Sequence, residues 1–288
     1  MTPENNSQNT RVGTLTQIGT ITKYNFLNYF RARRFYVMLT IILIISGLLT
    51  GLVAYYRPVG FVGVGPLGFY GAGWGSFANF VIVLSAAFFG GDAISGEFQN
   101  RTGYFLVPNP IRRSAIYVGK YLAALAASSV ILGVFALIMI ANGLYYFPGN
   151  VPSQFVESIA FAWVYLIAVL ALTFAFSSLF KSSSISILMS VILLLFVFNV
   201  IDEVATIVAG VEPWFSITYG AGIVADILTI PYPPHYSSTP IAAGGPGSRF
   251  SLATYHAGVP EGLLILAIYF VVMGVLGLWL FERKEFTS

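Results

Sequence analysis

Few residues of this 288-residue chain stand in a pattern that could carry out bond chemistry. Gly63, Gly65 and Gly68 have the spacing G-x-G-x-x-G, which can hold a dinucleotide pyrophosphate at the start of a helix. Such a site also needs a strand before the glycines, whereas this copy contains Pro66 and lies in a glycine-rich stretch between two apolar segments. We interpret it as a chance match in a flexible turn.

Other nucleotide-binding and hydrolase motifs are missing from the sequence. There is no G-x-x-x-x-G-K-[ST], so the chain cannot hold ATP phosphates in a P-loop of its own. H-E-x-x-H and G-x-S-x-G are also absent, and the lack of cysteine excludes disulfides, thiolate metal sites and Cys nucleophiles. We therefore expect no catalytic residue and no cofactor bound to this chain.

Two histidines and some nearby acids are the remaining candidates for chemistry. His235 and His256 are loop residues with no second type of metal ligand arranged beside them in the sequence, so we predict no metal site. An acid–base pair drawn from Asp202, Glu203 and His235 would make the chain an integral-membrane enzyme. The missing catalytic motifs disfavour that alternative.

A polar segment from position 92 to 120 is the most informative part of the chain. Asp92 and Glu97 lie near the start of a short predicted helix, where the helix dipole favours carboxylates. A glycine and two prolines then end the helix and turn the chain before the next apolar segment. The residues that could contact a partner are Asp92, Glu97, Arg101, Arg112 and Arg113, and Pro108 and Pro110 would fix the turn between them. Taken alone, this pattern favours a solvated loop, although a rigid charged elbow could also pass force from a soluble partner into the membrane.

The elements that position these residues follow from composition. Hydrophobic residues make up 57% of the chain and charged residues 9%, against about 25% charged residues in soluble domains. Lipid must therefore cover the surface, and the net charge of +3 is too small to indicate a nucleic-acid partner. The segments long enough, or nearly so, to span a bilayer are 35–56, 74–91, 115–146, 157–180, 184–207 and 260–281.

The fold class predicted is an all-α integral membrane protein with six transmembrane helices. With the N-terminus inside, only Arg57 and Arg249 of the 14 Lys and Arg residues fall outside, which predicts that both termini are cytoplasmic in a multi-pass cell-membrane protein. We expect a cytoplasmic tail and interfacial helix over 1–34, a membrane domain over 35–281 and a short tail over 282–288. Within the domain, 92–114 is a cytoplasmic segment and 208–259 an outer loop.

The region 17–34 has the pattern of an amphipathic helix. Apolar residues recur at every third position, and the basic residues are Lys23, Arg31, Arg33 and Arg34. Such a helix can lie in the headgroup layer with its basic side toward anionic lipid, or it can contact a partner.

The interiors of the predicted spans contain no charged residue and no histidine near their middle. Because ion-coupled carriers need such a group at depth, this disfavours a secondary transporter. Asn79, Asn142 and Asn199 are expected to hydrogen-bond neighbouring helices. Gly47 and Gly51 form a G-x-x-x-G pair that could line a dimer seam or a contact within the chain.

The polar segment also resembles a known family. The run Ile94-Ser-Gly-Glu97, then Arg101-Thr-Gly103, Pro108, Arg112-Arg113 and Gly119-Lys120, is similar to the permease subunits of type-2 ABC transporters. The resemblance implies that 92–103 is a coupling helix seated in a cytoplasmic ATPase, that 17–34 is a connecting helix, and that two permease chains pair. It also implies that the outer loop 208–259 carries short re-entrant helices. ATP and Mg²⁺ would then be bound by the partner ATPase.

The leading hypothesis is therefore the permease subunit of an ATP-driven exporter whose substrate the sequence does not reveal. In this role the polar-segment residues would couple the chain to the ATPase, with Asp92 and Glu97 as polar contacts and the arginines as ionic anchors. The alternative is a structural membrane subunit of a larger complex that moves no substrate.

Overall fold

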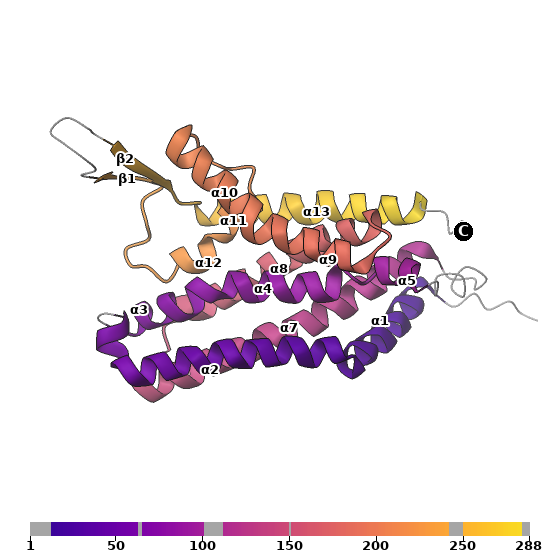
Figure 1. Ribbon diagram of the computed structural model, residues 1–288, viewed down its shortest axis with the longest axis horizontal. Coiled ribbons are helices and arrows are strands. Elements are labelled where there is room, and N and C mark those ends of the chain that lie inside the picture. The colour runs from indigo at the N-terminus through magenta and orange to yellow at the C-terminus, as the bar shows by residue number, and fades with distance from the viewer. Residues whose placement is uncertain (1–12, 63–64, 101–111, 150, 242–249, 284–288) are drawn as a thin grey trace, which may run out of the picture.

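The computed structural model describes residues 13–62, 65–100, 112–149, 151–241 and 250–283. Long helices lie side by side along one axis, and a small hairpin projects from one end (Figure 1). The helices of the first half are α1 (Thr14–Arg31), α2 (Arg33–Val62), α3 (Pro66–Tyr70), α4 (Ser76–Gly90), α5 (Ser95–Gln99) and α7 (Arg113–Tyr146). Those of the second half are α8 (Ser153–Leu179), α9 (Ser183–Ile192), α10 (Phe198–Glu203), α11 (Ile217–Ala221), α12 (Ile223–Asp226) and α13 (Val259–Arg283).

Six helical stretches are long and apolar enough to cross a membrane, as the hydropathy predicted. They are Arg33–Tyr56, Pro66–Gln99, Arg113–Tyr146, Ser153–Leu179, Ser183–Val208 and Val259–Arg283. Apolar side chains of the last two remain widely exposed, whereas α4 and α8 are largely buried. The all-α membrane class is therefore confirmed, with α4 and α8 at the centre of the bundle.

The second span begins earlier than the predicted 74–91. A π-helical turn, Gly71–Gly75, joins α3 to α4, so the helix continues through glycines that the sequence indicated as a turn. Buried Trp74 holds this turn in place, stacking on Phe135 at 5.5 Å between ring centroids and donating its indole N–H to Ser158 at 2.9 Å. The G-x-G-x-x-G match starts in positions 63–64, outside the described residues, and α2 rather than a strand precedes it.

The loop between the fifth and sixth spans contains two short helices, α11 and α12, and an antiparallel hairpin. Strand β1 (Tyr236–Ile241) pairs with β2 (Phe250–Tyr255), with Tyr236 opposite Tyr255. The resemblance implied the short helices, but the hairpin was not predicted. Its strands are short and carry Ser and Thr, so they lacked a clear strand pattern.

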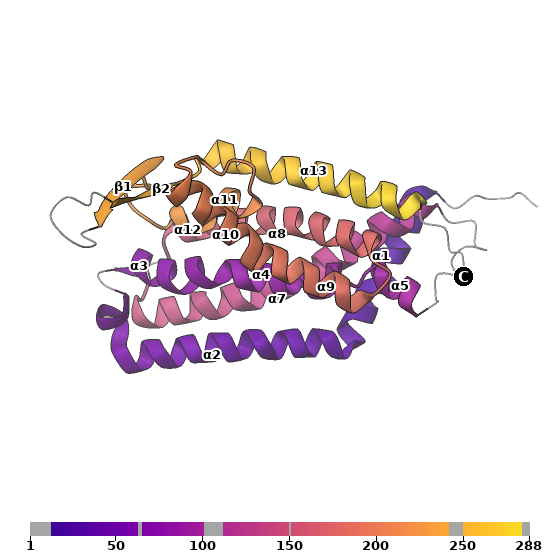
Figure 2. The same ribbon diagram turned by 45° about the horizontal axis from the view of Figure 1, so that its top comes forward.

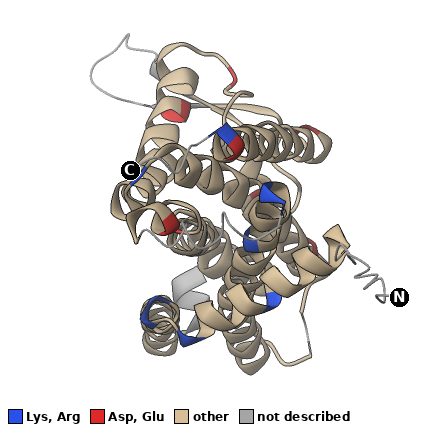
Figure 3. Ribbon diagram, turned by 90° about the vertical axis from the view of Figure 1, so that its right-hand side faces the viewer, with Lys and Arg blue, Asp and Glu red and all other residues tan. Residues whose placement is uncertain are grey.

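The two ends of the bundle differ, and we name them by what lies there. At the elbow end, α1, α5 and the last turn of α13 lie close together (Figures 1 and 2). At the hairpin end lie α3, α12, β1 and β2. Figure 3 looks onto the elbow end, with Lys and Arg in blue and Asp and Glu in red.

Candidate coupling site

The chain bends at the elbow end between α4 and α5, where the sequence predicted a short polar helix. Close packing positions this bend, because a side chain at Gly90 would collide with Thr173 and one at Gly91 would lie 3.2 Å from the Cα atom of Ile187. Ile94 at the start of α5 is also fully buried. The first part of this bend, through Gly96, is thus part of the packed bundle and not a solvated loop.

A serine from α8 caps the free N-terminal end of α5. The backbone N–H groups of Ile94 and Ser95 each donate to Ser177 Oγ at 2.9 Å, and Ser95 Oγ donates to the carbonyl of Gly91 at 2.8 Å. The first N–H groups of a helix have no partner within the helix, so a hydroxyl from another element satisfies them here. This fastens α5 to α8.

Glu97 turns inward and pairs with Lys120, a buried residue about two turns from the start of α7. The Lys120 ammonium forms an ion pair with Glu97 and also donates to the carbonyl of Ala93 at 2.9 Å. The Lys120 side chain is 9% exposed and that of Glu97 is 23% exposed. Charges this sheltered interact more strongly than a surface pair, so the contact joins α5 firmly to α7.

Asp92 connects two further helices to the elbow. Its carboxylate forms an ion pair with Arg34 at the start of α2 and accepts a hydrogen bond from the Ser183 hydroxyl at the start of α9. The Ser183 backbone N–H also donates to Gln99 Oε1 at 2.8 Å. A carboxylate at the N-terminus of α9 is favourably placed against its dipole.

The predicted amphipathic helix over 17–34 corresponds to α1, but α1 ends at Arg31, so Arg33 and Arg34 belong to α2 instead. Helix α1 packs against the first turns of α7. Gly119 makes this possible, because a Cβ there would lie 2.7 Å from a side-chain atom of Ile21. Thr22 Oγ1 donates to the Gly119 carbonyl at 3.2 Å, and Tyr29 donates to the carbonyl of Phe89 at 3.0 Å. Burial raises the pKa of Tyr29 above its ordinary value, because the buried contact disfavours the charged form of the hydroxyl. Helix α1 is therefore tied both to α7 and to the end of α4.

The basic residues predicted for the interfacial helix and the coupling segment fall into three groups. Lys23, Arg31 and Arg33 are exposed, whereas Arg34 is exposed but paired with Asp92. Arg112 and Arg113 begin α7 at the surface, where Arg113 donates to the carbonyl of Glu282 at 2.8 Å. Arg101 and Pro108 lie outside the described residues.

Sequence reasoning chose Asp92 and Glu97 as contacts to another protein, and that role stays a prediction. The structure assigns both carboxylates partners within the chain. Sequence reasoning overlooked Ser177 and Ser183, which have no local motif, and it had Lys120 only as a basic residue of a family motif. These partners lie far apart in the sequence, so spacing could not reveal them.

A second polar region lies toward the hairpin end, between α4, α8, α10 and α11. A cavity of about 110 Å³ is lined there by Asn79, Tyr165, Asn199 and Thr218, among others, and Tyr165 donates to Asn79 Oδ1 at 2.8 Å. Asp202 accepts hydrogen bonds from Ser216 and Thr218.

Two of the three span asparagines, Asn79 and Asn142, hydrogen-bond a neighbouring helix as predicted, whereas Asn199 bonds its own helical stretch. Asn79 accepts from a tyrosine on α8, Asn142 donates to Thr50 Oγ1 at 3.0 Å, and Asn199 donates to carbonyls of its own helical stretch. Of the residues of the alternative acid–base pair, Asp202 hydrogen-bonds Ser216 and Thr218, and His235 pairs with Glu212.

Six apolar helices, with a polar elbow at one end of their bundle, define a polytopic α-helical membrane protein. The chain matches the model of the family described as ABC-2 family transporter protein over residues 15–286. It therefore belongs to this family and is a permease subunit of an ABC transporter. No curated protein matches the chain.

Proposed function

We propose that this chain couples ATP hydrolysis by a separate cytoplasmic ATPase to the export of a substrate across the cell membrane. The elbow formed by residues 91–100 is the point at which the ATPase acts. The observation that carries the proposal is that four spans are fastened to this one short segment by polar contacts. Both termini and the elbow end face the cytoplasm in this arrangement, in agreement with the excess of Lys and Arg there.

The four contacts explain how a displacement of α5 would move the bundle. They run from the elbow to Arg34 on α2, Lys120 on α7, Ser177 on α8 and Ser183 on α9. Hydrogen bonds and ion pairs have preferred geometries, so a push on the elbow is transmitted to all four helices, least strongly through Arg34, whose side chain is 47% exposed. The ATPase would then favour one of two arrangements of the spans, which requires only that it bind the two states with different affinities.

Exposed residues at this end provide the docking surface. Gln99 and Asn100 are exposed at the tip of the elbow, and Arg112 is exposed at the start of α7. The exposed basic residues of α1 lie on the same end of the bundle. In this proposal the inward-facing carboxylates keep the elbow rigid, while these outer residues contact the ATPase.

A second permease chain would pair along the first span. A Cβ atom built at Gly47 or Gly51 meets nothing within 4 Å, and both glycines are exposed. Of the two interpretations of this G-x-x-x-G pair, the open face favours a seam between chains over a contact within the chain.

The test begins with the native complex. The chain is purified in mild detergent, and mass spectrometry identifies the proteins that accompany it. We expect a P-loop ATPase, and the absence of any such protein would overturn the proposal. A structural subunit that moves no substrate would fail the next step, in which the permease must stimulate ATP hydrolysis in proteoliposomes.

A matched pair of variants locates the docking surface. Asn100→Arg at the exposed elbow tip is expected to lower the stimulation of ATP hydrolysis at least about fivefold, since it adds a long charged side chain at the contact. Ser153→Arg makes the same neutral-to-cationic change at the exposed start of α8, at the opposite end, and should leave stimulation unchanged. Equal effects of the two variants would contradict docking at the elbow.

A further inference from the structure

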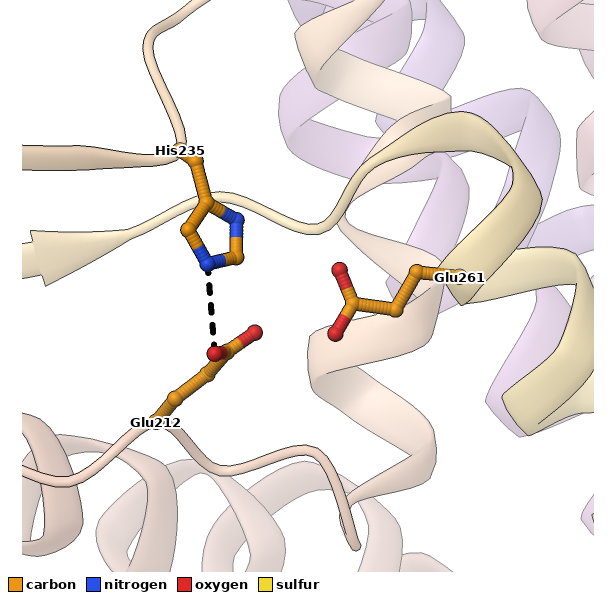
Figure 4. Close-up of side chains that lie close together, drawn as sticks. All are labelled: Glu212, His235 and Glu261. Carbon is orange, nitrogen blue, oxygen red and sulfur yellow. Dashed lines mark ion pairs between the residues drawn. The ribbon is translucent and has the colours of Figure 1, made fainter.

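Three side chains from distant segments converge at the hairpin end. Glu212 lies in the loop before α11, His235 directly before β1, and Glu261 in the first turn of α13 (Figure 4). One ligand atom from each residue lies within 4.8 Å of the other two, and His235 Nε2 is 3.2 Å from Glu212 Oε2. The sequence-based premise that no other metal-ligand type lies near His235 is therefore wrong, because folding brings the two glutamates to it.

The imidazole of His235 is oriented as a ligand. Its Nδ1 atom lies 3.1 Å from the carbonyl oxygen of His256. A carbonyl can only accept, so Nδ1 carries the proton, and in the neutral ring Nε2 presents its lone pair toward the glutamates. Metal-binding histidines commonly have this arrangement, in which a backbone carbonyl fixes the ring through the other nitrogen.

Each carboxylate likewise has one oxygen occupied and one directed to the centre. Glu212 Oε1 accepts a hydrogen bond from Tyr219 at 2.6 Å, and Glu261 Oε2 accepts from the backbone N–H of Gly258 at 3.2 Å.

Two acidic side chains lie close together here, with no Lys or Arg to compensate their charges in the described part of the chain. His235 is the basic partner found there for Glu212, and neither glutamate pairs with Lys or Arg among the described residues. A divalent ion at the centre would relieve the repulsion between the carboxylates. The His235 side chain is 56% exposed, so an ion can reach the centre from solvent.

We propose that Glu212, His235 and Glu261 bind a divalent transition-metal ion of the zinc type. One imidazole and two carboxylates suit Zn²⁺, whereas Ca²⁺ and Mg²⁺ prefer sites made of oxygen ligands alone. Water would complete the tetrahedron, since the chain supplies three ligands. The bound ion would fasten the loop before α11 and the base of the hairpin to the first turn of the last span, stabilising this end of the permease.

The experiment uses the full-length chain, purified in detergent without a polyhistidine tag and stripped of metal with EDTA. Calorimetric titration with ZnCl₂ is expected to give one ion per chain, and Zn²⁺ should raise the thermal unfolding midpoint because it binds the folded state. Co²⁺ in place of Zn²⁺ should give the visible absorption of a tetrahedral site. Failure of the EDTA-stripped protein to bind Zn²⁺ at concentrations up to about 100 µM would overturn the proposal, since a site of this kind should bind more tightly.

The chain contains a matched control in its other histidine. His235→Ala should weaken Zn²⁺ binding at least about tenfold, whereas His256→Ala keeps the backbone carbonyl that orients His235 and should bind normally. Glu261→Gln preserves side-chain volume, so it tests the site even if His235→Ala fails to fold, and it should also weaken binding at least about tenfold. Unchanged affinity in Glu261→Gln, or equal losses in the two histidine variants, would refute the assignment.

Discussion

The ion pair between Glu97 and Lys120 allows a quantitative test of the elbow. Replacing Glu97 by Gln removes the negative charge beside the Lys120 ammonium, whose side chain is only 9% exposed, although the amide oxygen of Gln can still accept a hydrogen bond. Breaking a buried ion pair from one side costs 3–5 kcal/mol, and because Glu97 is 23% exposed we expect the lower end, about 3 kcal/mol.

Replacing the other partner, Lys120, should lower the free energy of unfolding by less. Lys120→Met removes the buried charge and keeps an apolar stem, while Glu97 can still reach water, so we expect a loss of about 1–2 kcal/mol. The double variant contains no unpaired buried charge, and replacing a buried pair by groups of similar volume is often close to neutral. The sum of the two single losses in free energy of unfolding should therefore exceed the loss of the double variant by about 2 kcal/mol or more.

The free energy of unfolding can be measured by denaturant titration of the purified chain in mixed micelles, followed by far-UV circular dichroism. Lys23→Met is the matched control, since Lys23 is exposed on α1, and it should change the free energy of unfolding by less than about 0.5 kcal/mol. If the two single losses add up to that of the double variant, the pair does not join α5 to α7, and the elbow does not transmit force through it.

Three further outcomes follow from the packing and from one buried acid. Gly119→Ala places a Cβ against α1 and should destabilise the chain by about 2 kcal/mol in the same titration. The control is Gly133→Ala on the same helix, whose Cβ meets nothing within 4 Å and which should stabilise the chain by about 0.5–1 kcal/mol. Equal effects of the two variants would contradict the tight contact between α1 and α7. Trp74→Phe removes a buried indole donor and should cost at least about 1 kcal/mol, and an unchanged free energy of unfolding would contradict that hydrogen bond's contribution. Burial raises the pKa of Asp226 above its ordinary value of 3.8, although the hydrogen bond with His256 opposes this shift. The folded state therefore binds this proton more tightly than the unfolded state, so the stabilisation is present below pH 3.8 and is lost as pH rises through the raised pKa. Asp226→Asn should remove this part of the pH dependence of the free energy of unfolding. An unchanged pH profile would contradict the raised pKa of Asp226.

Hydropathy predicted the number and approximate bounds of the spans because crossing a bilayer requires about 20 apolar residues in succession, a property of each segment alone. The second span was the exception. Its start at Pro66 depends on a π-helical turn that Trp74 holds against α7 and α8, and no local pattern signals that packing.

The candidate sites likewise depend on tertiary contacts that leave no local pattern in the sequence. The sequence identified the elbow as a polar segment with Asp92 and Glu97, since charged residues are conspicuous in an apolar chain. It could not reveal that these acids point inward, because Arg34 and Lys120 come from other helices. The Glu212, His235 and Glu261 cluster had no sequence signal at all, because its members lie in three separate segments with no motif spacing.

The sequence by itself thus determined that lipid surrounds this protein, that its fold is helical with six transmembrane spans, and which family it resembles. These properties depend on composition and on short runs of residues. Only the tertiary structure decided which polar groups meet. Hydrogen bonds and ion pairs act over a few ångströms, and the helices that bring their partners within that distance are arranged by packing across the whole bundle.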